Sequence, residues 1–204
     1  MPITTFYVPT EDMFLDMHMY QGDTYSEDKC TDLFVHQTNC FTGNQVAGIA
    51  KTVFEKFPKL GRLAELKRMA EYPTKIVGGY DFDIQDRLMV ANLYGQLYPG
   101  SPDATKDDDN FEARATYLYN SLYSLLTERK DDFAPHVRIH MPLIASGLAA
   151  STSLMKLINT NNPSRYYFDV FVKPILEMAI RDARNKNCSD ILFSLGVYYL
   201  NKGI

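Results

Sequence analysis

The sequence predicts an α/β fold in which helices cover both faces of a mostly parallel or mixed sheet. Short apolar runs flanked by turn residues alternate along the chain with segments that repeat at the helical period. The clearest helical segment places apolar residues on one face at positions 111, 115, 118, 122 and 125. The chain has 204 residues, 46% hydrophobic and 23% charged, which is an ordinary globular composition with enough length for one sizeable core. We therefore expect one domain over residues 1–204.

The first half of the chain is expected to form three short strands and two helices. The strands are residues 3–8, which end at Pro9, residues 17–20 and residues 33–36, each an apolar run beside turn residues. Apolar residues at 46, 49, 50, 53 and 57 form a helical stripe after the Gly43-Asn44 turn, and Pro58 is expected to end that helix. A second helix is expected over residues 62–71, before Pro73.

The second half is expected to alternate strands with longer helices. Residues 75–77 and 88–93 are predicted strands, separated by the Gly78-Gly79 turn and the polar stretch 81–87. A loop over 99–109 leads into a helix at 111–128, and the preceding aspartates and Asn110 favour a helix start over a metal site. The remaining expected elements are a strand at 137–141, a short helix at 151–159, a turn-rich linker at 159–164, a helix at 168–185 and a strand at 191–195. Pro174 is expected either to begin or to kink that last helix.

Charge and cysteine content narrow the classes of partner and site. The net charge of −4 is not that of a protein whose main partner is nucleic acid, although backbone N–H groups could still hold one diphosphate. Cys30, Cys40 and Cys188 are odd in number and widely spaced, so neither a zinc site nor a disulfide framework is indicated. The N-terminal residues do not resemble a secretory signal, and residues 143–155 are too short and too polar to span a bilayer. We expect a cytoplasmic protein with no cofactor, no metal and no membrane partner.

Two segments have the form of a strand, a small-residue loop and a helix start. They are residues 34–50 and residues 139–150. Small side chains let backbone N–H groups approach phosphate oxygens at the carboxyl ends of parallel strands. Neither segment is a P-loop or a G-x-G-x-x-G turn, and tight packing of loop against helix is the alternative explanation for each.

Taken together and in this order, the two segments resemble the macro domain family. The resemblance covers roughly residues 17–195 and includes Gln21-Gly22-Asp23-Thr24, the strand and asparagine of 35–39, and Val46-Ala47-Gly48-Ile49-Ala50. It continues through the strand of residues 88–96 to Met141-Pro142-Leu143-Ile144-Ala145-Ser146-Gly147-Leu148. The resemblance implies a three-layer α/β/α macro domain with a mixed central sheet and a pocket for ADP-ribose or a derivative, free or attached to a macromolecule. The strand that carries His36 is most similar to that of the branch holding ADP-ribose-1″-phosphate phosphatases and small ADP-ribosyl hydrolases.

The resemblance also implies roles for individual residues. Asp23, with Thr24, would bind adenine, and Asn39 would contact the distal ribose. Phe193 or Tyr198 would stack on the adenine, although an aromatic residue there is more often part of the core. A turn aspartate and a loop-capping asparagine are the alternatives for Asp23 and Asn39. The diphosphate would be held by backbone amides of two loops, at Val46, Ala47, Gly48 and Ile49 and at Ala145, Ser146, Gly147 and Leu148.

The sequence departs from the family pattern at several of these positions. The first loop is not a run of glycines, and Ala145 and Ala150 replace glycines of the second. Ala47 and Ala149 stand where two branches of the family carry catalytic aspartates. An apparent insertion near residues 151–167 ends at Arg165-Tyr166-Tyr167, and it could be a lid with an arginine for a terminal phosphate or a surface elaboration.

Two functions remain open from the sequence. In the first, the protein is a hydrolase that removes a phosphate or an ADP-ribosyl group, with His36 as general base and Asn39 beside it. In the second, it is a non-catalytic binder of ADP-ribose or another nucleotide derived from NAD. The absent aspartates favour the binder, and the habit of the family slightly favours the enzyme. His36 could instead be a core histidine, and His140 has the same ambiguity.

Two further interpretations of the function also remain. Cys40 could form a nucleophilic pair with His36 or His140, but free cysteines are usually packing residues. A Rossmann-like domain for another nucleotide is the third possible class.

Overall fold

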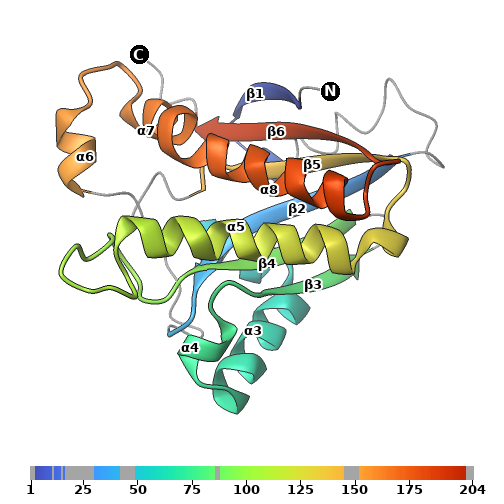
Figure 1. Ribbon diagram of the computed structural model, residues 1–204, viewed down its shortest axis with the longest axis horizontal. Coiled ribbons are helices and arrows are strands. Elements are labelled where there is room, and N and C mark those ends of the chain that lie inside the picture. Colours follow the sequence, from blue (N-terminus) through green and yellow to red (C-terminus); the bar gives the residue numbers. More distant parts are fainter. Residues whose placement is uncertain are drawn as a thin grey trace.

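The computed structural model describes residues 3–10, 12–14, 16, 30–41, 49–85, 88–144 and 152–200. Six strands form one sheet in the order β1-β6-β5-β2-β4-β3 (Figure 1). Every neighbouring pair is parallel except β3 and β4, which are antiparallel, so the mixed sheet expected from the sequence is confirmed. The strands are β1 (Thr4–Thr10), β2 (Cys30–Asn39), β3 (Tyr80–Gln85), β4 (Leu88–Gln96), β5 (His136–Pro142) and β6 (Leu192–Leu200).

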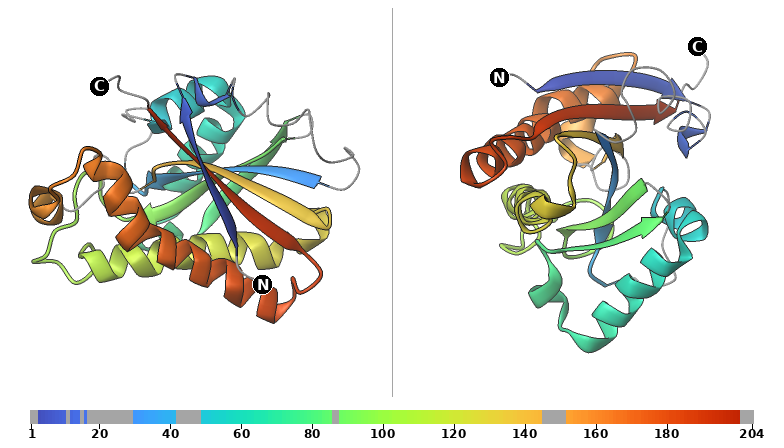
Figure 2. Two further views of the ribbon diagram at one scale, coloured as in Figure 1. Left: turned by 90° about the horizontal axis from the view of Figure 1, so that it is seen from above. Right: turned by 90° about the vertical axis from the view of Figure 1, so that its right-hand side faces the viewer.

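Helices cover both faces of this sheet, which gives three layers. The helices are α2 (Ile49–Lys56), α3 (Pro58–Ala70), α4 (Pro73–Ile76), α5 (Phe111–Glu128), α6 (Thr152–Leu157), α7 (Pro163–Tyr167) and α8 (Lys173–Lys186). A 3-10 turn over Lys130–Asp132 follows α5, and a π-helical turn over Phe168–Val172 precedes α8. Figure 2 shows α5 and α8 along one face and α2 and α3 along the other. None of the helices among the described residues is long and apolar enough to cross a membrane.

Side chains along the central strands point alternately to the two faces of the sheet, so the core is divided between these faces. Leu33 and Val35 of β2 belong to the large cluster beneath α5 and α8, together with Leu122 and Leu176. Phe34, between them in sequence, belongs to a separate cluster beneath α2 and α3. Because side chains of a strand point alternately to the two faces, both faces of β2 are buried, as expected for a central parallel strand.

Two expectations about local structure were wrong. Residues 75–77 do not form a strand, because Pro73 occupies the first turn of α4, which ends at Ile76. The polar stretch 81–87 instead contributes to the edge strand β3, where Lys67 and Lys59 pair with Asp81 and Asp83. The expected end of the preceding helix at Pro58 is confirmed, because α2 ends at Lys56, and Pro58 also begins α3, since proline fits the first helical position without losing a hydrogen bond.

Edge position also explains why β1 continues through Pro9. β1 pairs only with β6, so the missing N–H of Pro9 costs no hydrogen bond to a second neighbour. Pro174, likewise, lies in the first turn of α8, directly after the π-helical turn.

The loop between β4 and α5 is anchored by a buried arginine. Arg114 donates from Nε and Nη2 to the two carboxylate oxygens of Asp109 at 2.9 and 2.8 Å, and from Nη1 to the carbonyl of Gly100 at 2.6 Å. The side chain of Asn110 accepts from the N–H of Ala113 at 2.8 Å, so the predicted N-cap of α5 is confirmed. Among the described residues no group of three or more histidine, cysteine or acidic side chains could hold a metal ion.

Candidate functional site

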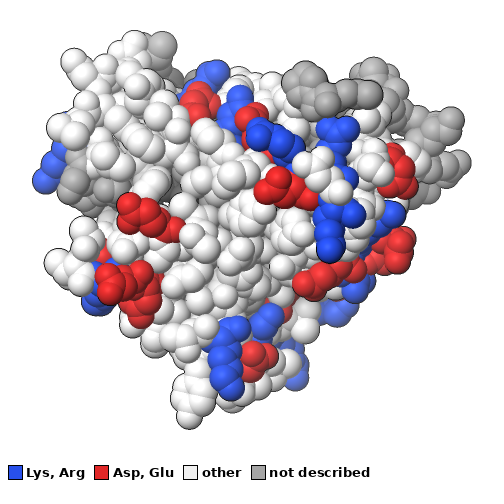
Figure 3. All heavy atoms as spheres, viewed as in Figure 1, with Lys and Arg blue, Asp and Glu red and all other residues white. Residues whose placement is uncertain are grey.

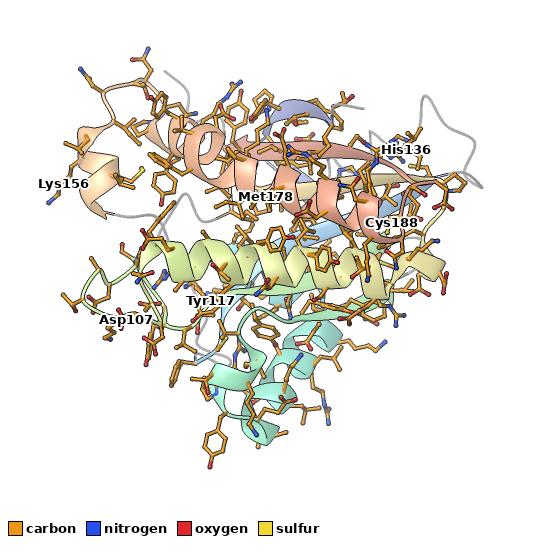
Figure 4. The ribbon with its side chains drawn as sticks, viewed as in Figure 1. Asp107, Tyr117, His136, Lys156, Met178 and Cys188 are labelled. Atoms are coloured by element: carbon orange, nitrogen blue, oxygen red, sulfur yellow. The ribbon has the colours of Figure 1, made fainter. Side chains whose placement is uncertain are left out.

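The carboxyl ends of the five parallel strands lie at one edge of the sheet, on the side of α6 and α7 (Figure 1). Figure 4 shows Lys156 of α6 on this side, while His136, the first residue of β5, and Cys188 lie at the opposite end. Asn39 is the last residue of β2, and Ile49, which is 36% exposed, is the first residue of α2. The expected strand 17–20 lies outside the described residues, as do nine predicted site residues: Asp23, Thr24, Val46, Ala47, Gly48, Ala145, Ser146, Gly147 and Leu148.

Asn39 is held in place by the backbone of the residues that follow it and by the segment after β4. Its Oδ1 accepts a hydrogen bond from the N–H of Phe41 at 2.9 Å. The N–H of Cys40 donates to the carbonyl of Leu97 at 3.1 Å, and the Phe41 ring stacks on Tyr98 with centroids 4.8 Å apart. The end of β2 is therefore fixed to the segment that follows β4.

Arg68 of α3 also fixes this strand end, and sequence reasoning missed it. Its Nη2 donates to the carbonyl of Asn39 at 2.6 Å and to the hydroxyl of Thr38 at 3.1 Å. The guanidinium lies over the ring of Tyr94, 5.8 Å from the centroid. A single arginine on a polar helix carries no motif, and only the packing of α3 against β2 and β4 places it beside Asn39.

A carboxamide chain continues across the same edge on the face of α5. Gln37 donates from Nε2 to Oε1 of Gln96 at 2.7 Å, and Gln96 donates to the carbonyl of Tyr98 at 3.0 Å. Gln37 also lines a small pocket with Phe111, Arg114 and Tyr167. The apolar side chains of this pocket come from the loop before α5, from α5 and α7, and from the π-helical turn and first turn of α8, so it lies next to the carboxyl edge of the sheet.

The geometry does not support His36 as a base in contact with substrate. Its side chain is 0% exposed, packs edge-on against Phe54 of α2, and bonds through Nε2 to Oδ1 of Asn92. Burial and the positive charge of Arg68 lower the pKa of His36 to about 4. The residue is thus the hydrogen-bonded core histidine that sequence reasoning held as its alternative.

Cys40 is likewise a packing residue. It is 0% exposed, and its thiol donates to the carbonyl of Gln96 at 3.4 Å. Burial raises the pKa of the Cys40 thiol to about 12, so the thiolate needed for nucleophilic attack does not form near neutral pH.

His140 takes part in a buried polar network that crosses three strands. Its Nε2 bonds with Asp32 of β2 at 2.7 Å and its Nδ1 with the hydroxyl of Tyr198 of β6 at 2.9 Å. Arg138 donates to the second carboxylate oxygen of Asp32 at 2.8 Å. Burial would raise the pKa of Asp32, but these hydrogen bonds outweigh it and hold the pKa below its usual value. The network joins the strands beneath the site and leaves neither histidine nitrogen for a substrate.

We expect Asp32→Asn to lower the free energy of unfolding by about 2 kcal/mol at pH 7, because Arg138 then loses a buried charged partner. The ionised Asp32 stabilises the fold above the carboxyl pKa of the unfolded chain, and this contribution is lost as the pH falls through the lower folded pKa. Urea unfolding at pH 7 and below pH 4 measures both effects. A gap between wild type and variant that stays constant down to acid pH would contradict the ionic contribution.

Comparisons with solved structures give the fold. No protein-family model matches the sequence, and no curated protein matches it. A protein of unknown function from Bacteroides thetaiotaomicron superposes with a TM-score of 0.59 at 15% identity, over 97% of this chain and 99% of the other. A macrodomain protein from Streptomyces coelicolor superposes with a TM-score of 0.53 at 15% identity, over 95% and 97% of the two chains. The macrodomain of Mycobacterium tuberculosis DarG gives 0.52 at 11% identity, over 96% and 97%. The chain has the macrodomain fold. This confirms the three-layer architecture that the sequence resemblance implied.

In the macrodomain fold of this chain, neither predicted aromatic is placed to stack on a ligand. Phe193 is the second residue of β6, at the amino end of the strand opposite Val137, and it is 7% exposed within the core beneath α8. This position, at the end of the strand away from the carboxyl edge, does not support the assignment of Phe193 to ligand stacking. Tyr198 lies nearer that edge but is 2% exposed and bonded to His140.

The arginine of the apparent insertion also lies elsewhere than expected. Arg165 of α7 stacks on Tyr7 of β1, 4.2 Å from the ring centroid, and pairs with Asp169 at 3.8 Å. β6 and β5 separate β1 from β2 in the sheet, so Arg165 does not lie beside Asn39. Its role as an arginine for a terminal phosphate is not supported by this arrangement.

Surface charge agrees with the composition. On the face shown in Figure 3, lysine and arginine side chains of the described residues are interspersed with acidic ones, and they form no continuous basic stripe.

Proposed function

We propose that this protein binds ADP-ribose or a derivative at the carboxyl edge of its sheet, with Asn39 at the distal ribose. The observation that carries the proposal is the position of Asn39. It ends the central strand β2, at the same edge as the end of β5, in a chain with the macrodomain fold. Ligands of open α/β sheets bind outside the carboxyl ends of the strands.

The remaining contacts of the proposed site follow from the sequence resemblance. Backbone amides of residues 46–49 and 145–148 would hold the diphosphate, and Asp23 with Thr24 would bind the adenine. Both loops start at the carboxyl edge, because they follow β2 and β5. An NAD-derived ligand also fits the cytoplasmic location that we propose for the chain.

We propose capture rather than turnover as the primary function. His36 is enclosed, the Cys40 thiol is protonated, and both expected aspartate positions carry alanine. None of the described residues beside Asn39 offers a carboxylate or imidazole in contact with the edge where the ribose would lie. Hydrolysis of ADP-ribose-1″-phosphate or of an ADP-ribosyl linkage is the alternative, and the absence of product after prolonged incubation with each substrate would separate the two.

Asn39→Ala is expected to weaken ADP-ribose binding about tenfold or more, because a hydrogen bond to the ribose is lost. Isothermal titration with ADP-ribose measures this, with AMP and NAD as comparison ligands. Binding of AMP is expected to change little, since AMP lacks the distal ribose. The matched control is Asn161→Ala, at an exposed position between α6 and α7. Absence of ADP-ribose binding by the wild type would overturn the proposal itself, and equal affinities of wild type and Asn39→Ala would remove Asn39 from the site.

A further inference from the structure

A small pocket on the α5 face of the sheet contains a buried polar atom that lacks a hydrogen bond. The pocket's lining includes Gln37 of β2, Phe111, Ala115 and Leu118 of α5, Tyr167 of α7 and Val172 of the π-helical turn. Oε1 of Gln37 is buried and has no hydrogen-bond partner among the described residues. An unpaired buried acceptor costs free energy, so this oxygen favours a molecule that brings an N–H or O–H group to it.

The orientation of the Gln37 carboxamide is set by a chain of hydrogen bonds that ends at a backbone carbonyl. The carbonyl of Tyr98 can only accept, so Gln96 turns its Nε2 toward it, at 3.0 Å. Oε1 of Gln96 then faces Gln37, which donates to it from Nε2 at 2.7 Å. If the Gln37 carboxamide were turned around, two carboxamide oxygens would face each other. Oε1 of Gln37 is therefore the end of the chain left unpaired, and polarisation along the chain makes it a stronger acceptor.

The backbone of β4 makes room for this side chain at Gly95. A Cβ at this position would lie 3.2 Å from Cγ and Cδ of Gln37 and 3.3 Å from Cδ1 of Leu118, which is tighter than ordinary van der Waals contact. Glycine thus lets the Gln37 side chain lie directly against β4. With β4 on one side and the hydrogen bond to Gln96 at its end, the carboxamide has a fixed place beside the pocket.

The other lining residues select the class of molecule that would fit. Arg114 is the charged residue of the lining, and its charge is balanced by Asp109 at 2.8 Å, so the pocket does not favour an anion. No lining residue is a carboxylate that would favour a cation. The remaining lining is mostly apolar and binds an apolar body. The volume open to the centre of a water molecule is about 20 Å³, where one water needs roughly 10–15 Å³, so a group larger than water is admitted.

We propose that this pocket is a second binding site, for a small neutral molecule whose flat apolar ring carries an O–H or N–H donor to Oε1 of Gln37. The apolar side chains hold the ring, and the hydrogen bond to Gln37 selects a ring with a donor over one without. None of the lining residues is assigned to ADP-ribose, so this site does not depend on the proposed function.

The test compares two probes on four proteins. Phenol, and toluene as its isostere without a donor, are titrated into the wild type, Gln37→Met, Ala115→Leu and Asn185→Met. Gln37→Met removes the acceptor at similar side-chain length, and Ala115→Leu fills the pocket from α5. Asn185→Met removes a carboxamide at an exposed position of α8 and is the matched control. The methyl NMR signals of Leu118 and Val172 report occupancy and give both dissociation constants, and thermal unfolding confirms that each variant is folded.

The wild type is expected to bind phenol about fivefold more tightly than toluene, as one hydrogen bond to an otherwise unpaired acceptor implies. Gln37→Met should lose this preference and still bind toluene. Ala115→Leu should weaken both probes about tenfold or more, because the space is filled. Asn185→Met should match the wild type. If Gln37→Met does not fold, the wild-type ratio and Ala115→Leu still decide.

Three results would overturn the inference. Unchanged Leu118 and Val172 signals with both probes up to millimolar concentration would mean that the pocket holds water only. Equal affinities of the wild type for phenol and toluene would remove Gln37 from recognition. Undiminished binding by Ala115→Leu would place the probes elsewhere. ADP-ribose is absent from all these titrations, so each of these results leaves the proposed function to its own test.

Discussion

Arg114→Met is expected to lower the free energy of unfolding by about 3–5 kcal/mol, the range found when one partner of a buried ion pair is removed. The variant leaves Asp109, which is 2% exposed, as a buried charge without its partner. It also removes the donor that satisfies the carbonyls of Gly100 and Ser101. Equilibrium urea unfolding monitored by circular dichroism measures the loss.

The double variant Asp109→Asn/Arg114→Met separates the charge from the packing. Removing the orphaned carboxylate should restore part of the stability, so the two substitutions together cost less than the sum of each alone. Arg62→Met, at an exposed site on α3, is the matched control and should change the free energy of unfolding by less than about 0.5 kcal/mol. A loss below about 1 kcal/mol for Arg114→Met would show that this network does not hold the loop.

Arg114 is connected to the proposed site through Tyr98. Nη2 of Arg114 lies 3.4 Å from the carbonyl of Tyr98, whose ring stacks on Phe41 two residues after Asn39. Lys106 of the same loop lies over the Tyr98 ring, 4.5 Å from its centroid. Loosening the loop therefore frees the end of β2. ADP-ribose affinity should fall in Arg114→Met even though Arg114 is not proposed to touch the ligand.

Strong local patterns explain how much of the fold the sequence predicts. The helix expected at 111–128 has the bounds of α5, because one continuous apolar stripe and the Asn110 cap agree. The sheet with both faces covered was also anticipated, whereas the strand expected at 33–36 extends in β2 from Cys30 to Asn39. Where the local sequence pattern was weak, tertiary contacts determined the secondary structure. β3 forms from a polar stretch because it completes the sheet edge beside β4 and because Lys59 and Lys67 pair with its aspartates.

The polar residues of the site region depend on strand register, which a single sequence does not reveal. Asp32 meets the side chains of Arg138 and His140 only because β2 and β5 pair in parallel with Asp32 opposite Arg138. His36 and His140 look alike in sequence, each at the end of an apolar run, yet one bonds to an asparagine and the other to an aspartate. Arg68 gave no signal, since its importance comes from the approach of α3 to β2. Phe193 was misplaced because its strand runs on to Leu200, which puts it at the amino end.

Between about pH 6.5 and pH 4 the protein is expected to lose about 3 kcal/mol of stability through His36 alone. Burial depresses the folded pKa of His36 to about 4, whereas the imidazole of the unfolded chain titrates near its ordinary value of 6.5. In that window the unfolded state binds the proton and the folded state does not, so each step toward acid favours unfolding. Above the window the stability is fully present. The stabilisation by ionised Asp32 is lost only below its ordinary carboxyl pKa, so the two losses of stability occupy separate pH ranges.

His36→Gln isolates this contribution, because the variant cannot titrate. It should be less stable than the wild type at pH 7.5, through the altered contact with Asn92, and its unfolding free energy should decline less between pH 6.5 and 4. His136→Gln, at a half-buried histidine whose pKa burial also lowers, is the control and should remove a smaller part of the decline. Equal slopes for wild type and His36→Gln would mean that the imidazole is accessible to protons in the folded state. That result would reopen the general-base role, whereas a flattened slope with unchanged ADP-ribose affinity at pH 7.5 fits an enclosed His36 that supports the sheet beneath the pocket without touching the ligand.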